Sequence, residues 1–258
     1  MKQLFLDFYF KYWKKKGWFG DYETWEAAKS DCEGYDTEGI LTKVLDAARQ
    51  VKTGKAAYER DSVLFYEKEK NDFVVQAILK TQNSEKGAKV LDFGGSLGST
   101  YFQNRPFIPQ LEKWCVVEQS HFVEIGKKEF EDGILSFELT LEKAFETVKP
   151  KIILINSVLQ YLEKPYELIS KINLLPVGYL LIERTPVADL EKDRITKQIV
   201  PNYIYKANYP SWIFSEKALE NAFCKNWTII DNNNTPYGLH HAGGKQIGLK
   251  NLLLKRRS

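Results

Sequence analysis

The chain has 258 residues, 43% of them hydrophobic and 14% aromatic, with a formal net charge of +3 at pH 7. This composition excludes a disordered chain, and the length suffices for one domain with a substantial core and an extension. The small, well-mixed charge gives no argument for a nucleic-acid partner. Cys32, Cys115 and Cys224 are too widely spaced for a disulfide framework or a metal pattern, so we expect reduced thiols and a cytoplasmic protein.

The first sixteen residues combine an aromatic run with a basic end. Asp7 interrupts the apolar run, the basic cluster follows it, and no small-residue cleavage site is present, so we exclude a signal peptide. Lys14–16 beside aromatic residues would suit contact with an anionic membrane surface, but we favour a packed helix with a solvated basic end. No segment reaches the roughly 18 apolar residues that a membrane span needs.

Up to residue 86 the pattern is helical. Apolar residues recur at helix spacing between Ile40 and Val51 and again between Phe73 and Ile78. We therefore expect residues 1–86 to form a helical N-terminal extension or cap. The charged run from Tyr58 to Asp61 is either a solvated face or a lid, and we prefer the lid because the extension has to pack somewhere and a binding crevice needs a cover.

From residue 87 to residue 258, short apolar runs alternate with helical stretches. The runs are 89–93, 114–118, 134–137, 151–156, 178–183, 227–231 and 246–254. Alternation of this kind predicts an α/β fold with a Rossmann-like, doubly wound and mostly parallel sheet of about seven strands. No helix fits between the last two runs, so we expect them to form an antiparallel hairpin at the sheet edge.

The strongest candidate site follows the first run, where Asp92, Gly94, Gly95, Ser96 and Gly98 form a glycine-rich turn. A ligand can approach the backbone of such a turn, and the first turn of a doubly wound sheet lies at the binding crevice. The dinucleotide pattern G-x-G-x-x-G fails here, because serines occupy its second and third glycine positions. The acid before the turn fits S-adenosylmethionine better, since a carboxylate would attract its ammonium group. A turn without a ligand is the alternative.

Polar residues end the next strands of the predicted sheet. Glu118 closes the second run, where an acid can accept hydrogen bonds from ribose hydroxyls. Asn156 and Ser157 follow the fourth run, at the edge where the crevice opens, and we expect them to line the donor pocket. Tyr161 is either a packing residue or part of the substrate pocket.

The acceptor side is predicted from two further segments. Glu183 and Arg184 end the fifth run, either as an exposed strand end or as a substrate clamp. His240 and His241 lie in the hairpin connection, residues 235–245, where glycines would permit a mobile loop and one histidine would serve as general base. Solvated loop histidines are the alternative. The histidine spacing supports no zinc site, so we expect no metal.

Residues 85–258 resemble the class I S-adenosylmethionine-dependent methyltransferases. That family's usual pattern is D-x-G-x-G-x-G followed by an acid at the end of the second strand, and here Ser96 replaces the middle glycine. A histidine often stands in related methyltransferases where this chain has Gln160. The resemblance implies adenosylmethionine as cofactor and methyl transfer as reaction.

A narrower resemblance covers most of the chain. It is to bacterial methyltransferases of unassigned substrate that are often encoded among surface-polysaccharide genes. The matching segments are 18–22, 25–28, 34–36, 58–62, 92–95, 156–161, 183–186 and 209–215. This resemblance implies a small-molecule or saccharide acceptor. Two alternatives stay open: a nicotinamide-dependent Rossmann enzyme, and a non-catalytic protein that keeps the fold.

Overall fold

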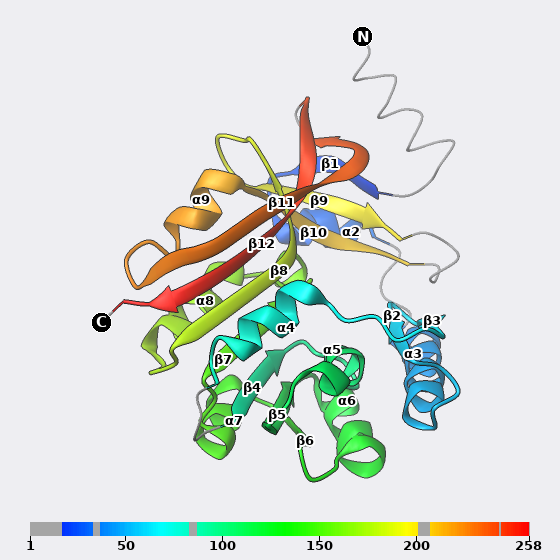
Figure 1. Ribbon diagram of the computed structural model, residues 1–258. Coiled ribbons are helices and arrows are strands. Elements are labelled where there is room, and N and C mark those ends of the chain that lie inside the picture. Colours follow the sequence, from blue (N-terminus) through cyan, green and yellow to red (C-terminus); the bar gives the residue numbers. More distant parts are fainter. Residues whose placement is uncertain (1–16, 33–36, 83–86, 201–206, 243, 258) are drawn as a thin grey trace.

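Seven strands form the predicted Rossmann-like sheet in the computed structural model, which describes residues 17–32, 37–82, 87–200, 207–242 and 244–257 (Figure 1). The basic N-terminal segment of residues 1–16 lies outside the described residues. The seven strands are β4 (Ala88–Phe93), β5 (Leu111–Val117), β6 (Leu135–Glu138), β7 (Ile152–Asn156), β8 (Tyr179–Ala188), β11 (Trp227–Ala242) and β12 (Lys245–Arg256). Their spatial order is β6-β5-β4-β7-β8-β12-β11, with β4 to β8 parallel and the β11–β12 hairpin antiparallel.

This order creates a switch point beside β4. From β4 the chain proceeds outward to β5 and β6, and then returns to place β7 and β8 on the other side of β4. The loops leaving β4 and β7 therefore diverge toward opposite sides. In an open α/β sheet this divergence leaves a crevice at the carboxyl ends of the strands.

Three further strands extend the sheet beyond the prediction. They are β1 (Gly17–Tyr22), β9 (Arg194–Ile199) and β10 (Asn208–Ser215). β10 pairs in parallel with the end of β8, where Phe214 lies opposite Val187, and β9 joins β10 to β1 through antiparallel pairs. The N-terminal region is thus not purely helical, because β1 belongs to the main sheet. The division at residue 86 remains a prediction.

Helices cover both faces of the parallel part of the sheet. One face packs against α7 (Leu141–Val148), α8 (Pro165–Leu174) and α9 (Glu216–Asn221). The opposite face packs against α3 (Thr37–Lys52), α4 (Asp72–Leu79), α5 (Ser99–Asn104) and α6 (Ser120–Ile125). Strand residues such as Leu91 and Ile153 on one face and Val90 and Leu154 on the other are fully buried. Each such side chain contributes roughly 1.5–3 kcal/mol by leaving water.

The remaining elements are short, and some of them reach the crevice. The short helix α2 (Trp25–Ser30) contacts β9 and β10. A two-stranded hairpin, β2 (Tyr58–Arg60) and β3 (Val63–Phe65), contacts α3 and α5. The helical turns are η2 (Arg105–Phe107), η3 (Gly126–Phe130) and η4 (Leu159–Tyr161). Those among these elements that reach the crevice are α2, the β2–β3 hairpin and η4.

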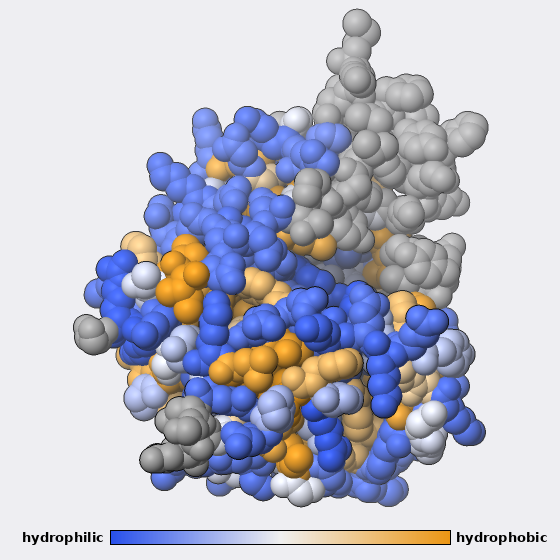
Figure 2. All heavy atoms as spheres, viewed as in Figure 1, coloured by the Kyte–Doolittle hydropathy of each residue, from blue (hydrophilic) through white to orange (hydrophobic). Residues whose placement is uncertain are grey.

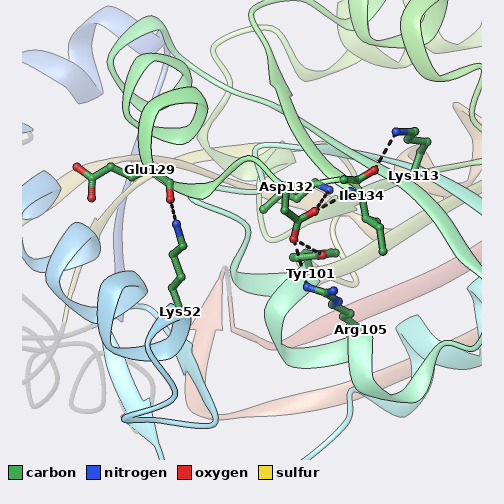
Figure 3. Close-up of polar contacts among 9 residues, drawn as sticks. Lys52, Tyr101, Arg105, Lys113, Glu129, Asp132 and Ile134 are labelled. Atoms are coloured by element: carbon green, nitrogen blue, oxygen red, sulfur yellow. Dashed lines mark hydrogen bonds and ion pairs between the residues drawn. The ribbon is translucent and has the colours of Figure 1, made fainter.

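Polar contacts tie α3 and the turn before β6 to the rest of the domain (Figure 3). Arg49 donates two hydrogen bonds of 2.8 Å to the Glu129 carboxylate, and Lys52 donates to the Glu129 backbone oxygen. Asp132 accepts hydrogen bonds from the Tyr101 hydroxyl at 3.0 Å and the Arg105 guanidinium at 3.2 Å. Helix α3 is therefore docked against η3, the segment that leads into β6.

The surface seen in Figure 2 is mainly hydrophilic, and its hydrophobic residues lie in separate small groups. Among the described residues, no helix is both long and apolar enough to cross a bilayer.

Candidate active site

A cavity of about 1430 Å³ opens at the carboxyl ends of β4, β5 and β7 and beside the middle of β8. It is lined by the turn after β4, by the residues that end β5 and β7, and by Glu183 and Arg184 of β8, where the pairing with β7 ends. The β2–β3 hairpin and β12 contribute further walls. Its volume exceeds the 300–1,000 Å³ usual for a site that holds one small ligand. The cavity is therefore large enough for a donor and an acceptor together.

Backbone conformation explains the residues of the glycine-rich turn. Gly94 and Gly98 have φ values of +74° and +93°, which L side chains rarely adopt. A Cβ at Gly94 would lie 2.5 Å from Val158 Cγ2, and a Cβ at Gly95 would lie 2.6 Å from Asp92 Oδ2. Ser96 also has a positive φ, +53°, so it takes the left-handed conformation that a glycine would take at no cost.

Asp92 lies beneath this turn and is not among the residues that line the cavity. It is 1% exposed, and its Oδ2 accepts a hydrogen bond of 3.2 Å from Trp114 Nε1. Burial raises the pKa of Asp92 to about 7. The predicted direct contact with a ligand ammonium group has no support in this geometry, in which Asp92 instead packs under Gly95. Gly98, the N-cap residue of α5, is likewise not among the lining residues.

Glu118 lines the cavity directly after β5. Its Oε1 accepts a hydrogen bond of 3.2 Å from the Ser96 N–H, and its Oε2 accepts one of 2.9 Å from the Gln119 N–H. Burial raises the pKa of Glu118, and the two backbone hydrogen bonds partly offset that increase. The acid is therefore fixed beside the glycine-rich turn, as the predicted register requires.

Asn156, Ser157 and Arg184 meet where β7 ends and its pairing with β8 stops. Asn156 Oδ1 accepts a hydrogen bond of 3.0 Å from Arg184 Nε. Ser157 and Arg184 have φ values of +60° and +50°, so the backbone takes the left-handed conformation at both positions where it reaches the cavity. The Arg184 N–H donates to Asn251 Oδ1 of β12 at 2.7 Å, which holds the arginine from a second side. Strained backbone of this kind is frequent at functional sites.

Glu183 and Tyr161 also line the cavity. Glu183 is 4% exposed, and its Oε1 accepts a hydrogen bond of 2.6 Å from Asn71 Nδ2. The ring of Tyr161 packs edge-on against Tyr209 at 5.1 Å between centroids. Glu183 is thus a buried cavity carboxylate and not an exposed strand end.

The β2–β3 hairpin covers part of the cavity, as expected for the predicted lid. Glu59, Arg60, Asp61 and Ser62 line it. Glu59 is 5% exposed and accepts hydrogen bonds from the Ser99 hydroxyl and, at 2.9 Å, from the Ser62 N–H. Because Ser99 begins α5, Glu59 connects the hairpin to the helix that follows the glycine-rich turn.

The two predicted catalytic histidines lie in a strand and not in a mobile loop. The hairpin connection predicted for residues 235–245 is strand β11 up to Ala242. His241 pairs with Gln246 in β12 and is not among the residues that line the cavity. The His240 side chain lies outside the described part of the structure. The role of a histidine as general base stays a prediction, and for His241 the cavity geometry does not support it.

Several cavity residues were missed from the sequence. Asn71 is the N-cap residue of α4, and Asn251 belongs to β12. No local sequence pattern distinguishes either of them. Leu139 lines the cavity with 58% of its surface exposed, close in sequence to α7, and Phe122 of α6 lines it too. An exposed leucine between a strand and a helix is a weak signal that could have indicated contact with a flat apolar group.

Comparison with known proteins identifies the fold. No protein-family model and no curated protein matches the sequence. The N-terminal domain of EvdMO1, solved in the presence of SAH and D-fucose, matches with a TM-score of 0.50 and 12% identity over 86% of this chain and 98% of that domain.

Two further solved structures are similar to a lesser degree. The 1,6-didemethyltoxoflavin-N1-methyltransferase of Burkholderia thailandensis, with bound 1,6-didemethyltoxoflavin and S-adenosylhomocysteine, has a TM-score of 0.45 and 14% identity over 87% of this chain and 92% of that chain. The cyclase SpnF has a TM-score of 0.49 and 12% identity over 84% of this chain and 94% of that chain. At these identities the likeness concerns the fold, and of the three the EvdMO1 domain alone reaches a TM-score of 0.50.

Proposed function

We propose that this chain is an S-adenosylmethionine-dependent methyltransferase that acts on a small-molecule or saccharide acceptor. One observation carries the proposal: the glycine-rich turn and the Glu118 carboxylate are hydrogen-bonded to each other on the wall of one cavity at the switch point of the sheet. An acid at the end of the second strand is the arrangement that receives a ribose diol in doubly wound folds.

The lining residues fit the donor along its length. The open backbone of Gly94 and Gly95 leaves room for the amino-acid part, and Glu118 would accept hydrogen bonds from the ribose hydroxyls. Phe122 and Leu139 offer apolar surface for the adenine. Bound adenosylmethionine would supply a methyl group on a positively charged sulfur, and the acidic side chains of the cavity favour a cation.

The acceptor would lie against the other end of the cavity. Tyr161, Glu183 and Arg184 surround that end together with Asn251. Carboxylate, guanidinium and amide groups beside an aromatic ring are suited to a ligand with several hydroxyl groups. The presence of D-fucose with the EvdMO1 domain is consistent with a sugar acceptor. The protein's own work would be to orient the acceptor oxygen and to remove its proton. A cytoplasmic location and a role in polysaccharide synthesis are part of this proposal.

A ligand-binding screen tests the proposal. S-adenosylhomocysteine should raise the melting temperature of the protein, because a ligand that binds only the folded state stabilises it by mass action. NAD(H) should give no shift, since the turn lacks the dinucleotide spacing. Stabilisation by NAD(H) alone would favour the nicotinamide-dependent enzyme. Binding of adenosylhomocysteine without turnover on any acceptor would favour the non-catalytic scaffold.

A further inference from the structure

Glu183 is held in one orientation in β8, at the point where the pairing with β7 ends. Asn71 Nδ2 donates a hydrogen bond of 2.6 Å to Glu183 Oε1. Asn71 is itself fixed: its Oδ1 accepts from the Val74 N–H as the N-cap of α4, and its backbone N–H donates to Asn104 Oδ1 at 2.8 Å. A carboxylate whose donor is anchored at two further points has little freedom to rotate.

The second oxygen of this carboxylate has no such contact. Glu183 Oε2 is buried and has no hydrogen-bond partner among the described residues, although Glu183 lines the cavity. A buried polar atom left without a partner destabilises the folded state, and more so when it is charged. Arrangements of this kind persist where a ligand provides the missing donor.

The charges around Glu183 come from three elements. Burial raises the pKa of Glu183, and Arg184 of β8 and Arg60 of β2 oppose that increase. The negative charge of Glu183 contributes in turn to the raised pKa of Asp92 in β4. Both arginines line the cavity, and their positive charges offset only part of the effect of burial on the pKa of Glu183.

We propose that Glu183 is the catalytic residue that accepts the proton of an acceptor hydroxyl through Oε2, and that Asn71 positions it. This inference rests on the proposed methyl transfer. In the step, a bond forms between the acceptor oxygen and the methyl carbon, and the carbon–sulfur bond breaks with its electron pair remaining on sulfur. The hydroxyl proton passes to Glu183 and then to water. A proton acceptor of raised basicity is what such a transfer needs near neutral pH.

Glu183→Gln tests the catalytic role, because it keeps the size of the side chain and an acceptor for Asn71 but removes the proton acceptor. Turnover is measured as methyl transfer from labelled adenosylmethionine to free hexoses, deoxyhexoses and nucleoside diphosphate sugars. We expect turnover to fall by about 10²-fold or more, while the Kd for adenosylhomocysteine by calorimetry changes by less than about threefold. Glu146→Gln is the matched control: Glu146 is exposed on α7 and is not among the residues that line the cavity, and turnover should be unaffected.

Asn71→Asp tests the positioning role. An aspartate keeps the N-cap of α4 but sets a second carboxylate against Glu183 Oε1. Repulsion between the two carboxylates should raise the pKa of Glu183 further. A base must be deprotonated to work, so the acid limb of the turnover profile should move to higher pH, and turnover above that limb should fall because the hydrogen bond that orients Glu183 is lost. NMR titration of ¹³C-labelled glutamate, with adenosylhomocysteine present, should report the same shift without any acceptor.

The outcomes separate this inference from the function on which it rests. Absence of adenosylhomocysteine binding contradicts the proposed function itself. Binding with full turnover in Glu183→Gln overturns the inference. The inference is also overturned if the acid limb of the turnover profile of Asn71→Asp lies at the same pH as that of the wild type. In that case the loss of activity in Glu183→Gln would be structural. If the protein binds adenosylhomocysteine but methylates no hydroxyl compound in the panel, the proposal of a hydroxyl acceptor is overturned.

Discussion

The backbone N–H of Ser96 donates a hydrogen bond of 3.2 Å to Glu118 Oε1, which joins the glycine-rich turn to the end of the neighbouring strand. If Glu118 binds the ribose of the donor, Glu118→Ala should weaken adenosylhomocysteine binding by about tenfold or more. The reason is that charge-assisted hydrogen bonds contribute roughly 1.5–3 kcal/mol each, and about 1.4 kcal/mol corresponds to tenfold in Kd. Isothermal calorimetry provides the measurement.

Glu138 provides the matched control for this substitution. It ends β6 as Glu118 follows β5, but it is not among the residues that line the cavity. Glu138→Ala should leave the Kd unchanged. An unchanged Kd in Glu118→Ala as well would remove Glu118 from the site.

Asp92→Asn should stabilise the protein at high pH. The folded-state pKa of about 7 lies above the ordinary value of 3.8, so the folded state favours the protonated carboxyl. The protonated Asp92 carboxyl therefore stabilises the folded state below pH 4. This contribution to the free energy of unfolding is lost as the pH rises toward 7, and the loss is at most about 4 kcal/mol at 1.36 kcal/mol per pKa unit. Asparagine has no such titration, and it can still accept from Trp114 Nε1.

Thermal unfolding of both proteins from pH 4 to pH 9 measures this effect. The variant should have the higher Tm above pH 7, and the difference should shrink toward pH 4. Adenosylhomocysteine binding should be retained, because Asp92 lies beneath the turn. A large loss of binding in a folded variant would instead support the sequence-based hypothesis that Asp92 contacts the ligand's ammonium group.

Asp132→Ala should destabilise the turn before β6. Asp132 Oδ1 accepts hydrogen bonds of 2.7 Å from both the Ile134 and the Leu135 N–H groups. Burial acts to raise the pKa of Asp132, but these two bonds, with help from Tyr101 and Arg105, lower it overall. The stability is therefore present above the unfolded pKa of about 3.9 and lost as the pH falls through the lower folded value.

We expect Asp132→Ala to cost about 1–3 kcal/mol at pH 7, the usual penalty for leaving backbone donors unpaired. Chemical denaturation at pH 7 and pH 3 measures the free energy of unfolding. The difference between variant and wild type should shrink at pH 3. A difference that is equal at both pH values would mean that the carboxylate charge has no part in the effect.

The two candidate bases give opposite expectations for the double variant His240→Gln/His241→Gln. His241 is not among the residues lining the cavity, so with Glu183 as the base we expect turnover within a few-fold of the wild type. The sequence-based hypothesis expects a loss of about 10²-fold or more. Such a loss, with unchanged circular dichroism and adenosylhomocysteine binding, would return the proton-accepting role to a histidine.

The parallel part of the fold could be predicted from the sequence because its strands are buried on both faces. Runs such as β7 are apolar at nearly every position, which leaves a strong local signal. β9 and β10 leave a weaker one, since β9 mixes charged and apolar residues and Pro210 interrupts β10. β1 contains two glycines with positive φ, Gly17 and Gly20, and glycine within a strand weakens the local signal.

The site was accessible from the sequence only where it follows the strands. The glycine-rich turn, Glu118, Asn156 and Glu183 could be placed at the binding edge because parallel strands end together. The partner of Glu183 could not, because Asn71 lies 112 residues away and no local pattern records such a contact. The sequence pattern also located Asp92 before the glycine-rich turn, but it did not indicate that the Asp92 side chain lies beneath the backbone of that turn.

Titration of the purified chain with S-adenosylhomocysteine, and separately with NAD⁺ and NADH, tests the proposed function most directly. Calorimetry should give one adenosylhomocysteine site per chain and no heat of binding with either dinucleotide. Gly95→Val should abolish the signal, since even the Cβ would lie 2.6 Å from Asp92 Oδ2 and force the turn to move. Binding of NAD⁺ or NADH in the absence of adenosylhomocysteine binding would contradict the methyltransferase account.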